Sequence, residues 1–254
     1  MTESVNWDKE AVKYQRVFET AGKNQYNIKL LDFLCSRLGL RPGIRVIDIG
    51  CGVGKYGTYF ADMGCDVTLT DISGEMLRHA RENMQAYSSP CTFLQCDFND
   101  VSPQNESFSP PFELAISTMS PAVHDVNTVK KMSAITNGFC FVSRFTDWEQ
   151  PIRDEYYRLS GTAPKHRMDS DALKQDVERL VGFIKEAGFS PIVKIEDYSW
   201  TDVRSPREAA ARFADCESGA EFDRALETVK ELCSHEGDFV DTVNTKVAWI
   251  YWKS

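Results

Sequence analysis

The sequence predicts an α/β fold in which a doubly wound, mostly parallel sheet carries helices on both faces. Short apolar runs alternate with amphipathic segments between residues 44 and 145, which is the order of successive βαβ units. Residues 46–57 read VIDIGCGVGKYG, an apolar run followed by closely spaced glycines, which indicates a buried strand, a tight turn and a helix start. With 254 residues, of which 42% are hydrophobic, the chain can bury a large core.

Two amphipathic helices are expected before the first strand. Residues 5–20 place Trp7 and Phe18 among charged side chains, and residues 26–39 carry Leu31 and Leu34 on one face. The segment 41–43, Arg-Pro-Gly, should end the second helix.

The elements of the parallel sheet follow in a regular order. Strands are predicted at 44–49, 66–71, 91–97, 112–118 and 138–145, and helices at 55–63, 73–84 and 126–136. Ser73 is placed to cap the helix that follows the second strand. Residues 99–111 are polar and proline-rich, so we expect an irregular loop there.

The second half of the chain changes character. Residues 146–168 are aromatic and lack a period, so they are expected to be irregular. Helices are predicted at 170–187, 206–215 and 221–235, with strands at 190–200 and 245–253. Ser205 and Glu208 form a capping-box pattern with Pro206 at the first helical position. With no repeat or long linker, we predict one domain over 1–254, whose helices 1–40 and insertion 201–244 form a substrate cap.

The glycine turn has two interpretations. Gly52, Gly54 and Gly57 satisfy the G-x-G-x-x-G pattern of dinucleotide-binding domains. However, Asp48 lies two residues before Gly50, and a carboxylate there would repel a pyrophosphate and attract a cationic amino-acid group. The turn therefore favours a positively charged nucleoside ligand over a dinucleotide.

The pattern D-x-G-x-G-x-G at residues 48–54 resembles motif I of the class I S-adenosylmethionine (SAM)-dependent methyltransferases. The resemblance covers residues 40–145 through motifs and the rest through topology. It implies a seven-stranded sheet with an antiparallel last strand, SAM as cofactor and methyl transfer as activity. An NAD(P)-linked oxidoreductase is one alternative, although no Tyr-x-x-x-Lys pair follows the fifth strand. A non-catalytic SAM-binding regulator is another.

The cofactor site is expected at the carboxyl ends of the strands, where open α/β sheets bind ligands. Asp71 ends the second strand, 23 residues after Asp48, and an acid there can bind both hydroxyls of a ribose or, alternatively, cap the next helix. The resemblance implies that Asp97 faces the adenine amino group. The predicted cofactor-binding residues share these strand ends and are Asp48, Gly50, Cys51, Gly52, Gly54, Asp71, Ile72, Met76, Cys96, Asp97, Phe98 and Ser117.

The acceptor should lie beside the segment that follows the fourth strand. His124 is the histidine near the expected reaction centre, where it could act as general base or could instead pack against or cap the next helix. The segment 117–125 lacks the N-P-P-[YF] and Pro-Cys motifs, which argues against adenine, glutamine and cytosine C5 methylation. Predicted acceptor contacts are Tyr14, Tyr26, Met119, Ser120, Trp148 and Tyr157.

Charge and composition limit the partners. The net charge of −9 disfavours nucleic acids and anionic membranes, because both require neutralisation of phosphates, so a small-molecule acceptor is expected. The polar N-terminus is unlike a signal peptide and no apolar run is long enough to span a membrane, which predicts a cytoplasmic protein. The eight cysteines show no metal-ligand spacing with histidines, so no metal is expected. The sequence does not indicate the oligomeric state.

Overall fold

The computed structural model describes residues 6–21, 25–163, 168–234 and 237–254. Its strands are β1 (Arg45–Ile49), β2 (Asp66–Asp71), β3 (Cys91–Gln95), β4 (Phe112–Thr118), β5 (Thr136–Glu149), β6 (Ile192–Arg204) and β7 (Phe239–Lys253). Its helices are α1 (Trp7–Ala21), α2 (Gln25–Leu38), α3 (Lys55–Asp62), α4 (Gly74–Met84), the 3-10 turn η1 (Glu106–Phe108), α5 (Val126–Ala134), α6 (Pro151–Ser160), α7 (Ser170–Glu186), α8 (Pro206–Ala214) and α9 (Ala220–Glu231).

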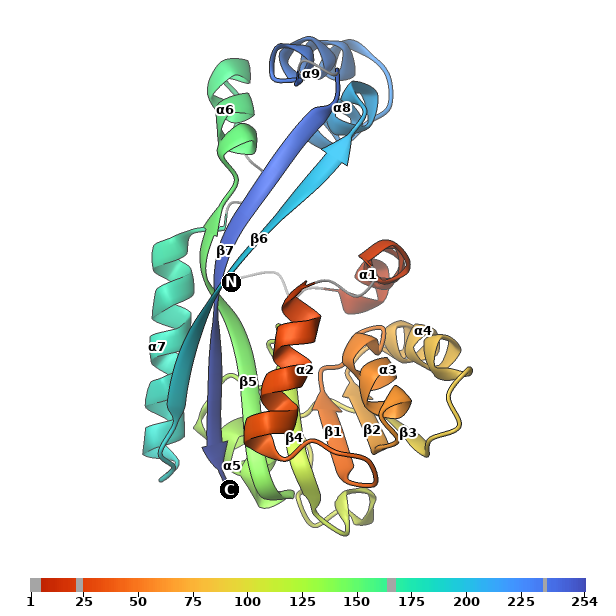
Figure 1. The fold of residues 1–254 in the computed structure, drawn as a ribbon, viewed down its shortest axis with the longest axis vertical. Helices are drawn as coiled ribbons and strands as arrows, with labels where there is room; N and C mark the ends of the chain where they lie inside the picture. Colours follow the sequence, from red (N-terminus) through yellow and green to blue (C-terminus); the bar gives the residue numbers. More distant parts are fainter. Residues whose placement is uncertain (1–5, 22–24, 164–167, 235–236) are drawn as a thin grey trace. The chain divides into compact units, whose positions relative to one another are not determined.

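The strands form a seven-stranded sheet in the order β3-β2-β1-β4-β5-β7-β6 (Figure 1). β1 pairs in parallel with β2 and β4, and parallel pairing continues from β2 to β3 and from β4 to β5. β7 runs antiparallel to β5. At one end the Ser254 amide donates a hydrogen bond to the Gly138 carbonyl, and at the other end the Thr245 hydroxyl donates one to the Asp147 carbonyl. The predicted doubly wound sheet with an antiparallel last strand is confirmed.

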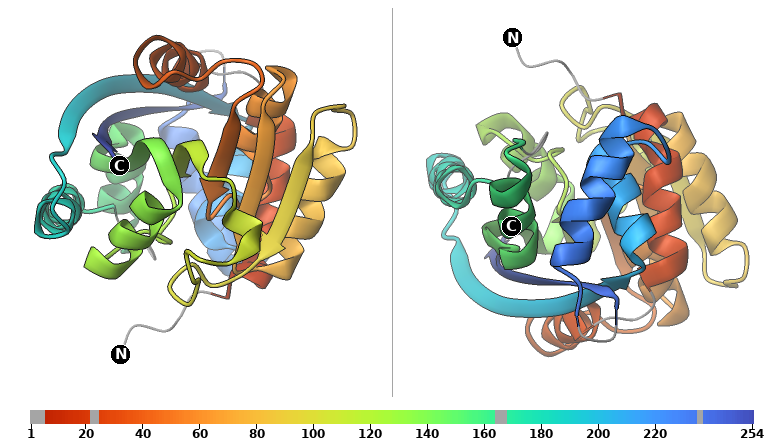
Figure 2. Two further views of the ribbon diagram at one scale, coloured as in Figure 1. Left: turned by 90° about the horizontal axis from the view of Figure 1, so that it is seen from below. Right: turned by 90° about the horizontal axis from the view of Figure 1, so that it is seen from above.

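Helices flank both faces of this sheet (Figure 2). On one face, Ile47 and Ile49 of β1 join a buried cluster with Met132 of α5 and Leu180 and Ile184 of α7. Asp48 alternates with these two isoleucines, so its side chain points to the opposite face. The sheet registers place Asp48 in one row with Ile116 and Phe141.

Helix α2 packs on that opposite face through Phe33. The Phe33 ring lies 6.3 Å from the ring of Phe141 in β5 and 4.8 Å from that of Trp249 in β7. Residues of α3 cover the same face nearer β2, where Gly57 contacts Leu69. The side chain of Asp48 is therefore enclosed by apolar packing, which matters for its charge.

The structure differs from the predicted elements mainly after residue 145. A helix, α6, occupies Pro151–Ser160 in the segment expected to be irregular. β5 continues to Glu149 instead of ending at residue 145, because it pairs with β7, where Thr146 donates to the carbonyl of Lys246. Pairing with a distant strand is a tertiary effect that local periodicity does not report.

The chain groups into two compact units. The first contains residues Met1–Arg144, Asp176–Ile195 and Ala248–Ser254, and the second contains Phe145–Gln175 and Glu196–Val247. The second unit has its own apolar core, in which Tyr156 of α6 stacks on Phe213 at 3.7 Å, with Phe222 and Val229 of α9 close by. A single domain whose residues 1–40 and 201–244 form a substrate cap stays a prediction.

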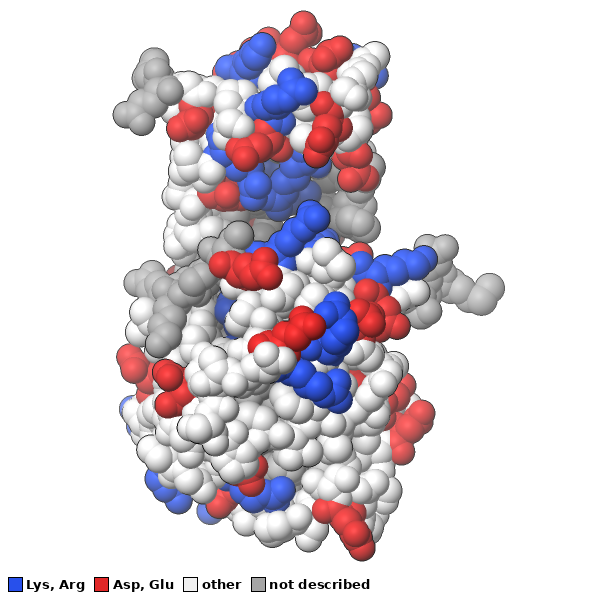
Figure 3. Space-filling view, turned by 90° about the vertical axis from the view of Figure 1, so that its right-hand side faces the viewer, with Lys and Arg blue, Asp and Glu red and all other residues white. Residues whose placement is uncertain are grey.

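The surface carries both signs of charge. Basic and acidic side chains are interspersed on the face drawn in Figure 3. None of the helices in the described ranges combines the length and the hydropathy that a membrane span requires.

Close packing of α3 on the sheet can be tested at Gly57. A methyl group there would lie 2.6 Å from Leu69 Cδ2 and 3.1 Å from Met84 Sδ, so Gly57→Ala should lower the free energy of unfolding by about 1–3 kcal/mol. Gly182→Ala in α7 is the matched control, because the added methyl group meets open space and should stabilise the helix by roughly 0.5–1 kcal/mol. Urea denaturation measures both, and equal stabilities would contradict the described packing.

Candidate functional site

A cavity of about 200 Å³ lies in the first unit, at the carboxyl ends of β1 to β4. This is the edge at which open α/β sheets bind ligands. The cavity is bounded by the glycine turn, the ends of β2 and β3, the β4–α5 loop and α1. Its lining residues are Trp7, Tyr14, Gly50, Gly52, Thr70, Asp71, Ile72, Met76, Cys96, Asp97, Phe98, Met119, Ser120, Pro121, Ala122 and His124.

The turn after β1 presents bare backbone to this cavity. The amides of Gly50 and Cys51 both donate to the carbonyl of Thr70, at 2.8 and 3.0 Å, which ties the turn to the end of β2. Gly50 has a φ of 70°, and a Cβ there would lie only 1.9 Å from Ser120 Oγ. Position 50 therefore requires glycine for both its conformation and its surroundings.

Asp71 is held in place by main-chain hydrogen bonds. Its Oδ2 accepts from the Gly52 amide and its Oδ1 from the Ser73 amide, both at 2.9 Å. Burial raises the pKa of Asp71, and these hydrogen bonds act in the opposite direction. The cap of α4 is Ser73, whose Oγ accepts from the Met76 amide at 3.0 Å, as predicted. Asp71 is therefore a pre-oriented carboxylate with remaining acceptor capacity at the cavity wall.

Asp48 lies beneath the turn and does not line the cavity. Its side chain is 1% exposed, and neither carboxyl oxygen has a hydrogen-bond partner in the part of the chain that the structure describes. Burial, followed by the negative charge of Asp71, raises the pKa of Asp48 to about 8. Tyr56 of α3 lies near enough that Asp48 contributes to the raised pKa of its hydroxyl, after burial and Tyr26. Among the described residues, this carboxyl group has no positively charged partner.

The other end of the site is the β4–α5 loop. Met119 adopts a left-handed conformation with a φ of 51°, and its amide donates to the Ser143 carbonyl at 3.2 Å. This conformation turns the chain into the loop that carries His124. Asp125 caps α5 through a capping box with Thr128, so capping is not the role of His124.

The imidazole of His124 is exposed at the cavity. Its Nδ1 lies 3.1 Å from the carbonyl oxygen of Pro121. If Nδ1 carries the hydrogen in that contact, Nε2 is left as a proton acceptor. The geometry is compatible with a general base and equally with a residue that only positions the loop.

Most predicted site residues line this cavity, and a smaller group does not. The lining group comprises Tyr14, Gly50, Gly52, Asp71, Ile72, Met76, Cys96, Asp97, Phe98, Met119, Ser120 and His124. Among the predicted residues that do not line it are Asp48, Cys51, Gly54, Ser117 and Tyr26. Ser117 is fully buried and donates to the Ile49 carbonyl, and the Tyr26 hydroxyl donates to Ser143 Oγ. Trp7, Thr70, Pro121 and Ala122 line the cavity although they are not among the predicted site residues.

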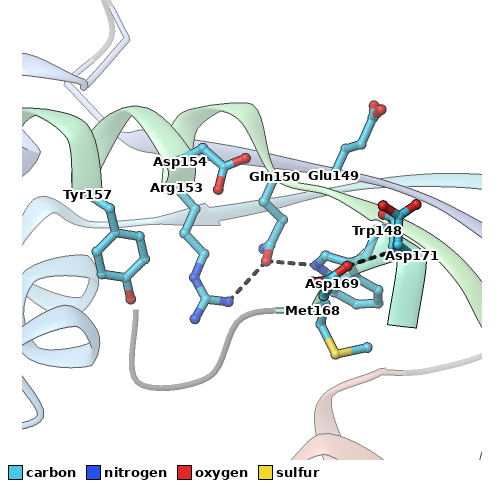
Figure 4. Close-up of a pocket in the computed structure, with 10 residues that line it drawn as sticks. Trp148, Glu149, Gln150, Arg153, Asp154, Tyr157, Met168, Asp169 and Asp171 are labelled. Carbon is cyan, nitrogen blue, oxygen red and sulfur yellow. Dashed lines mark hydrogen bonds between the residues drawn. The ribbon is translucent and has the colours of Figure 1, made fainter. Parts of the chain in front are cut away.

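The two remaining predicted residues, Trp148 and Tyr157, line a cavity of about 470 Å³ within the second unit (Figure 4). Gln150 organises its wall, because its Oε1 accepts from Trp148 Nε1 at 2.9 Å and from Arg153 Nη1 at 3.0 Å. The Arg153 guanidinium lies 5.8 Å from the centre of the Tyr157 ring. The other described lining residues are Glu149, Asp154, Met168, Asp169, Ser170 and Asp171. Across the described residues, no group of three or more His, Cys, Asp or Glu is arranged to hold a metal ion.

Residues 46–136 match the family described as "Methyltransferase domain". The chain is similar to malonyl-[acyl-carrier protein] O-methyltransferase of Enterobacter lignolyticus, with 41% identity over 63 residues that make up 25% of each chain. It is also similar to methyltransferase phqN of Penicillium fellutanum, with 25% identity over 60% of this chain and 44% of that one. The matches thus span a quarter and under a half of these two relatives' lengths.

Two solved structures share the fold. One is phosphoethanolamine N-methyltransferase 2 of Haemonchus contortus, with a TM-score of 0.54 and 16% identity over 100% of this chain and 61% of that one. The other is a precorrin 8w decarboxylase of Methanobacterium thermoautotrophicum, with a TM-score of 0.52 and 14% identity over 92% of each chain. At these identities the likeness establishes the fold alone.

The charge state of Asp48 predicts a pH dependence of stability. Its pKa is about 8 in the folded protein and 3.8 as its ordinary value, so the folded state holds this proton more tightly than the unfolded state. The contribution of Asp48 to stability is therefore fully present below about pH 4 and is lost as the pH rises towards 8. Asp48→Asn should raise the melting temperature more at pH 9 than at pH 5. The exposed Asp100→Asn is the control, and a gap between Asp48→Asn and the wild type that does not change with pH would contradict this account.

Proposed function

Because the chain belongs to the class I SAM-dependent methyltransferases, we propose that it transfers the methyl group of SAM to a small-molecule acceptor. The observation that carries the proposal is the bare glycine turn beside a pre-oriented Asp71, at the carboxyl edge of this sheet and inside the segment that matches the family. SAM, when bound, supplies a methyl group on a positively charged sulfur. The protein itself would bind and orient the reactants and shield them from water.

The residues around the cavity fit an adenosine group. Asp71 would accept hydrogen bonds from the two ribose hydroxyls, since its carboxylate is already oriented by the Gly52 and Ser73 amides. Ile72, which is half exposed, and the buried Phe98 offer apolar contact to the adenine ring. Asp97 is an acceptor at the end of β3 for the adenine amino group.

Electrostatics supports SAM over a dinucleotide. The Asp71 carboxylate lies at the cavity wall, and a diphosphate there would add negative charge beside it. The positive charge of the methionyl ammonium group of SAM would instead be attracted to Asp71, and it would favour the ionised form of Asp48 beneath the turn.

The β4–α5 loop would hold the acceptor in line with the methyl group. Methyl transfer from a sulfonium depends mainly on this alignment, so proximity supplies much of the rate. Met119 and Ser120 form the wall of the cavity at this point. Where the acceptor must lose a proton, His124 would take it at Nε2.

A small molecule suits the acceptor role best. The relatives include a malonyl-[acyl-carrier protein] O-methyltransferase and a cyclopropane-fatty-acyl-phospholipid synthase of Escherichia coli, so related chains differ in acceptor. The net charge of −9 and the interspersed charges of Figure 3 argue against a nucleic acid. Trp148 and Tyr157, which line the cavity of the second unit, stay predictions as acceptor contacts.

Donor binding is tested by calorimetry with SAM, S-adenosylhomocysteine and NAD. We expect SAM and S-adenosylhomocysteine to bind and NAD not to bind. Asp71→Ala should weaken SAM binding by roughly 1–3 kcal/mol, the cost of losing charged hydrogen bonds. Asp66→Ala removes an acid from the opposite end of the same strand, where it pairs with Arg45, and should leave the affinity unchanged. NAD binding in the cavity would refute the donor assignment, and an unchanged affinity in Asp71→Ala would refute the ribose role of Asp71.

The role of His124 is tested once an acceptor is found by release of S-adenosylhomocysteine across a panel of small metabolites. For an acceptor that loses a proton, His124→Gln should lower kcat by about 100-fold or more near neutral pH, with a smaller effect at alkaline pH. Turnover near that of the wild type between pH 6 and 9 would remove His124 as the base.

A further inference from the structure

Helix α1 is attached to the N-terminal end of α4 by a single carboxylate. Asp8 Oδ1 accepts a hydrogen bond from Ser73 Oγ at 2.5 Å and another from the Glu75 amide at 3.3 Å. These hydrogen bonds lower the pKa of Asp8, so its carboxylate is charged at neutral pH. The N-terminal end of α4 also favours a negative charge. Asp8 is thus the docking group of α1, meaning the side chain that attaches this helix to α4. It lies outside the glycine-rich motif.

Ser73 joins this docking group to the donor site. Its hydroxyl donates to Asp8 while accepting from the Met76 amide, and its own amide donates to Asp71 Oδ1. One residue therefore holds both the carboxylate that anchors α1 and the carboxylate proposed to bind the ribose.

The docked helix completes one wall of the cavity. Trp7 and Tyr14 of α1 line it, with their rings 6.3 Å apart in an edge-on arrangement. Trp7 also packs on a small buried cluster of Ala11, Val53 and Met76, which joins α1 to the glycine turn and to α4.

The far part of α1 has a second attachment to the same helix. Gln15 and Asn83 exchange side-chain hydrogen bonds at 3.0 and 2.9 Å, and Asn83 also donates to the carbonyl of Val53 in the glycine turn. Two polar contacts about two turns apart thus set the position of α1 along α4.

We propose that Asp8 is a positioning residue for the methyl donor: its hydrogen bonds to Ser73 and Glu75 hold α1 in place, so that Trp7 closes the cavity over the bound ligand. The inference rests on the proposed function, because it assumes that SAM occupies this cavity. A ligand that contacts both the glycine turn and α1 stabilises the docked helix, and the docked helix in turn strengthens ligand binding.

The test compares S-adenosylhomocysteine affinity and amide hydrogen exchange in α1. Asp8→Ala should bind S-adenosylhomocysteine about five- to tenfold more weakly than the wild type. Saturating ligand should slow exchange over residues 7–19 in the wild type and protect them less in Asp8→Ala. Glu10→Ala is the matched control, because this carboxylate pairs with Lys13 of the same helix, and it should behave as the wild type.

Two further variants separate docking from general structural effects. Asp8→Asn keeps an oxygen that can accept from Ser73, so it should recover part of the lost affinity. Trp7→Ala removes the aromatic wall of the cavity but keeps the Asp8 carboxylate. It should also weaken S-adenosylhomocysteine binding, while Asp8 still protects the amides at the start of α4 from hydrogen exchange.

The outcomes distinguish the two proposals. A wild-type protein that binds neither SAM nor S-adenosylhomocysteine refutes the proposed function. A wild-type protein that binds, together with an Asp8→Ala variant of equal affinity and equal ligand protection in α1, overturns the positioning role and leaves the proposed function intact.

Discussion

The contact between the main chain of Gly50 and the Ser120 hydroxyl is the constraint on which the site depends. No side chain fits between them, since a Cβ would lie 1.9 Å from Ser120 Oγ. This close approach brings the end of β4 against the turn after β1. Two backbone amides of the turn also donate hydrogen bonds to the Thr70 carbonyl, which fastens the turn to β2. The ends of three strands meet as a result, and Asp71 and Met119 come to face one cavity.

Much of the fold follows from local pattern, because helices and strands of the first half have clear periods and clear ends. The Ser73 cap, the Asp125 helix start and the strand that ends at Asp71 belong to this class. The elements after residue 145 were less predictable. β5 and β7 extend by pairing with each other, and α6 is short and rich in aromatic residues that pack within the second unit.

The candidate site was predictable to a similar degree, for a geometric reason. Parallel strands end at one edge, so residues 71, 97 and 119 had to lie along the same edge even though they are distant in sequence. Asp48 was expected to face the ligand as a carboxylate, yet the alternation of β1 turns it towards α2, where burial raises its pKa to about 8. Tyr14 lines one cavity while Trp148 and Tyr157 line another, and this assignment depends on tertiary structure, which composition does not encode.

The left-handed backbone of Met119 bears on how readily the acceptor range of such a protein can be diversified. At a φ of 51°, methionine has a higher conformational energy than glycine or asparagine would have. Replacing Met119 with glycine therefore relieves conformational strain and at the same time enlarges the cavity. Position 119 is for that reason a favourable starting point for directed evolution, since a mutation that opens room for bulkier substrates carries little penalty in foldability.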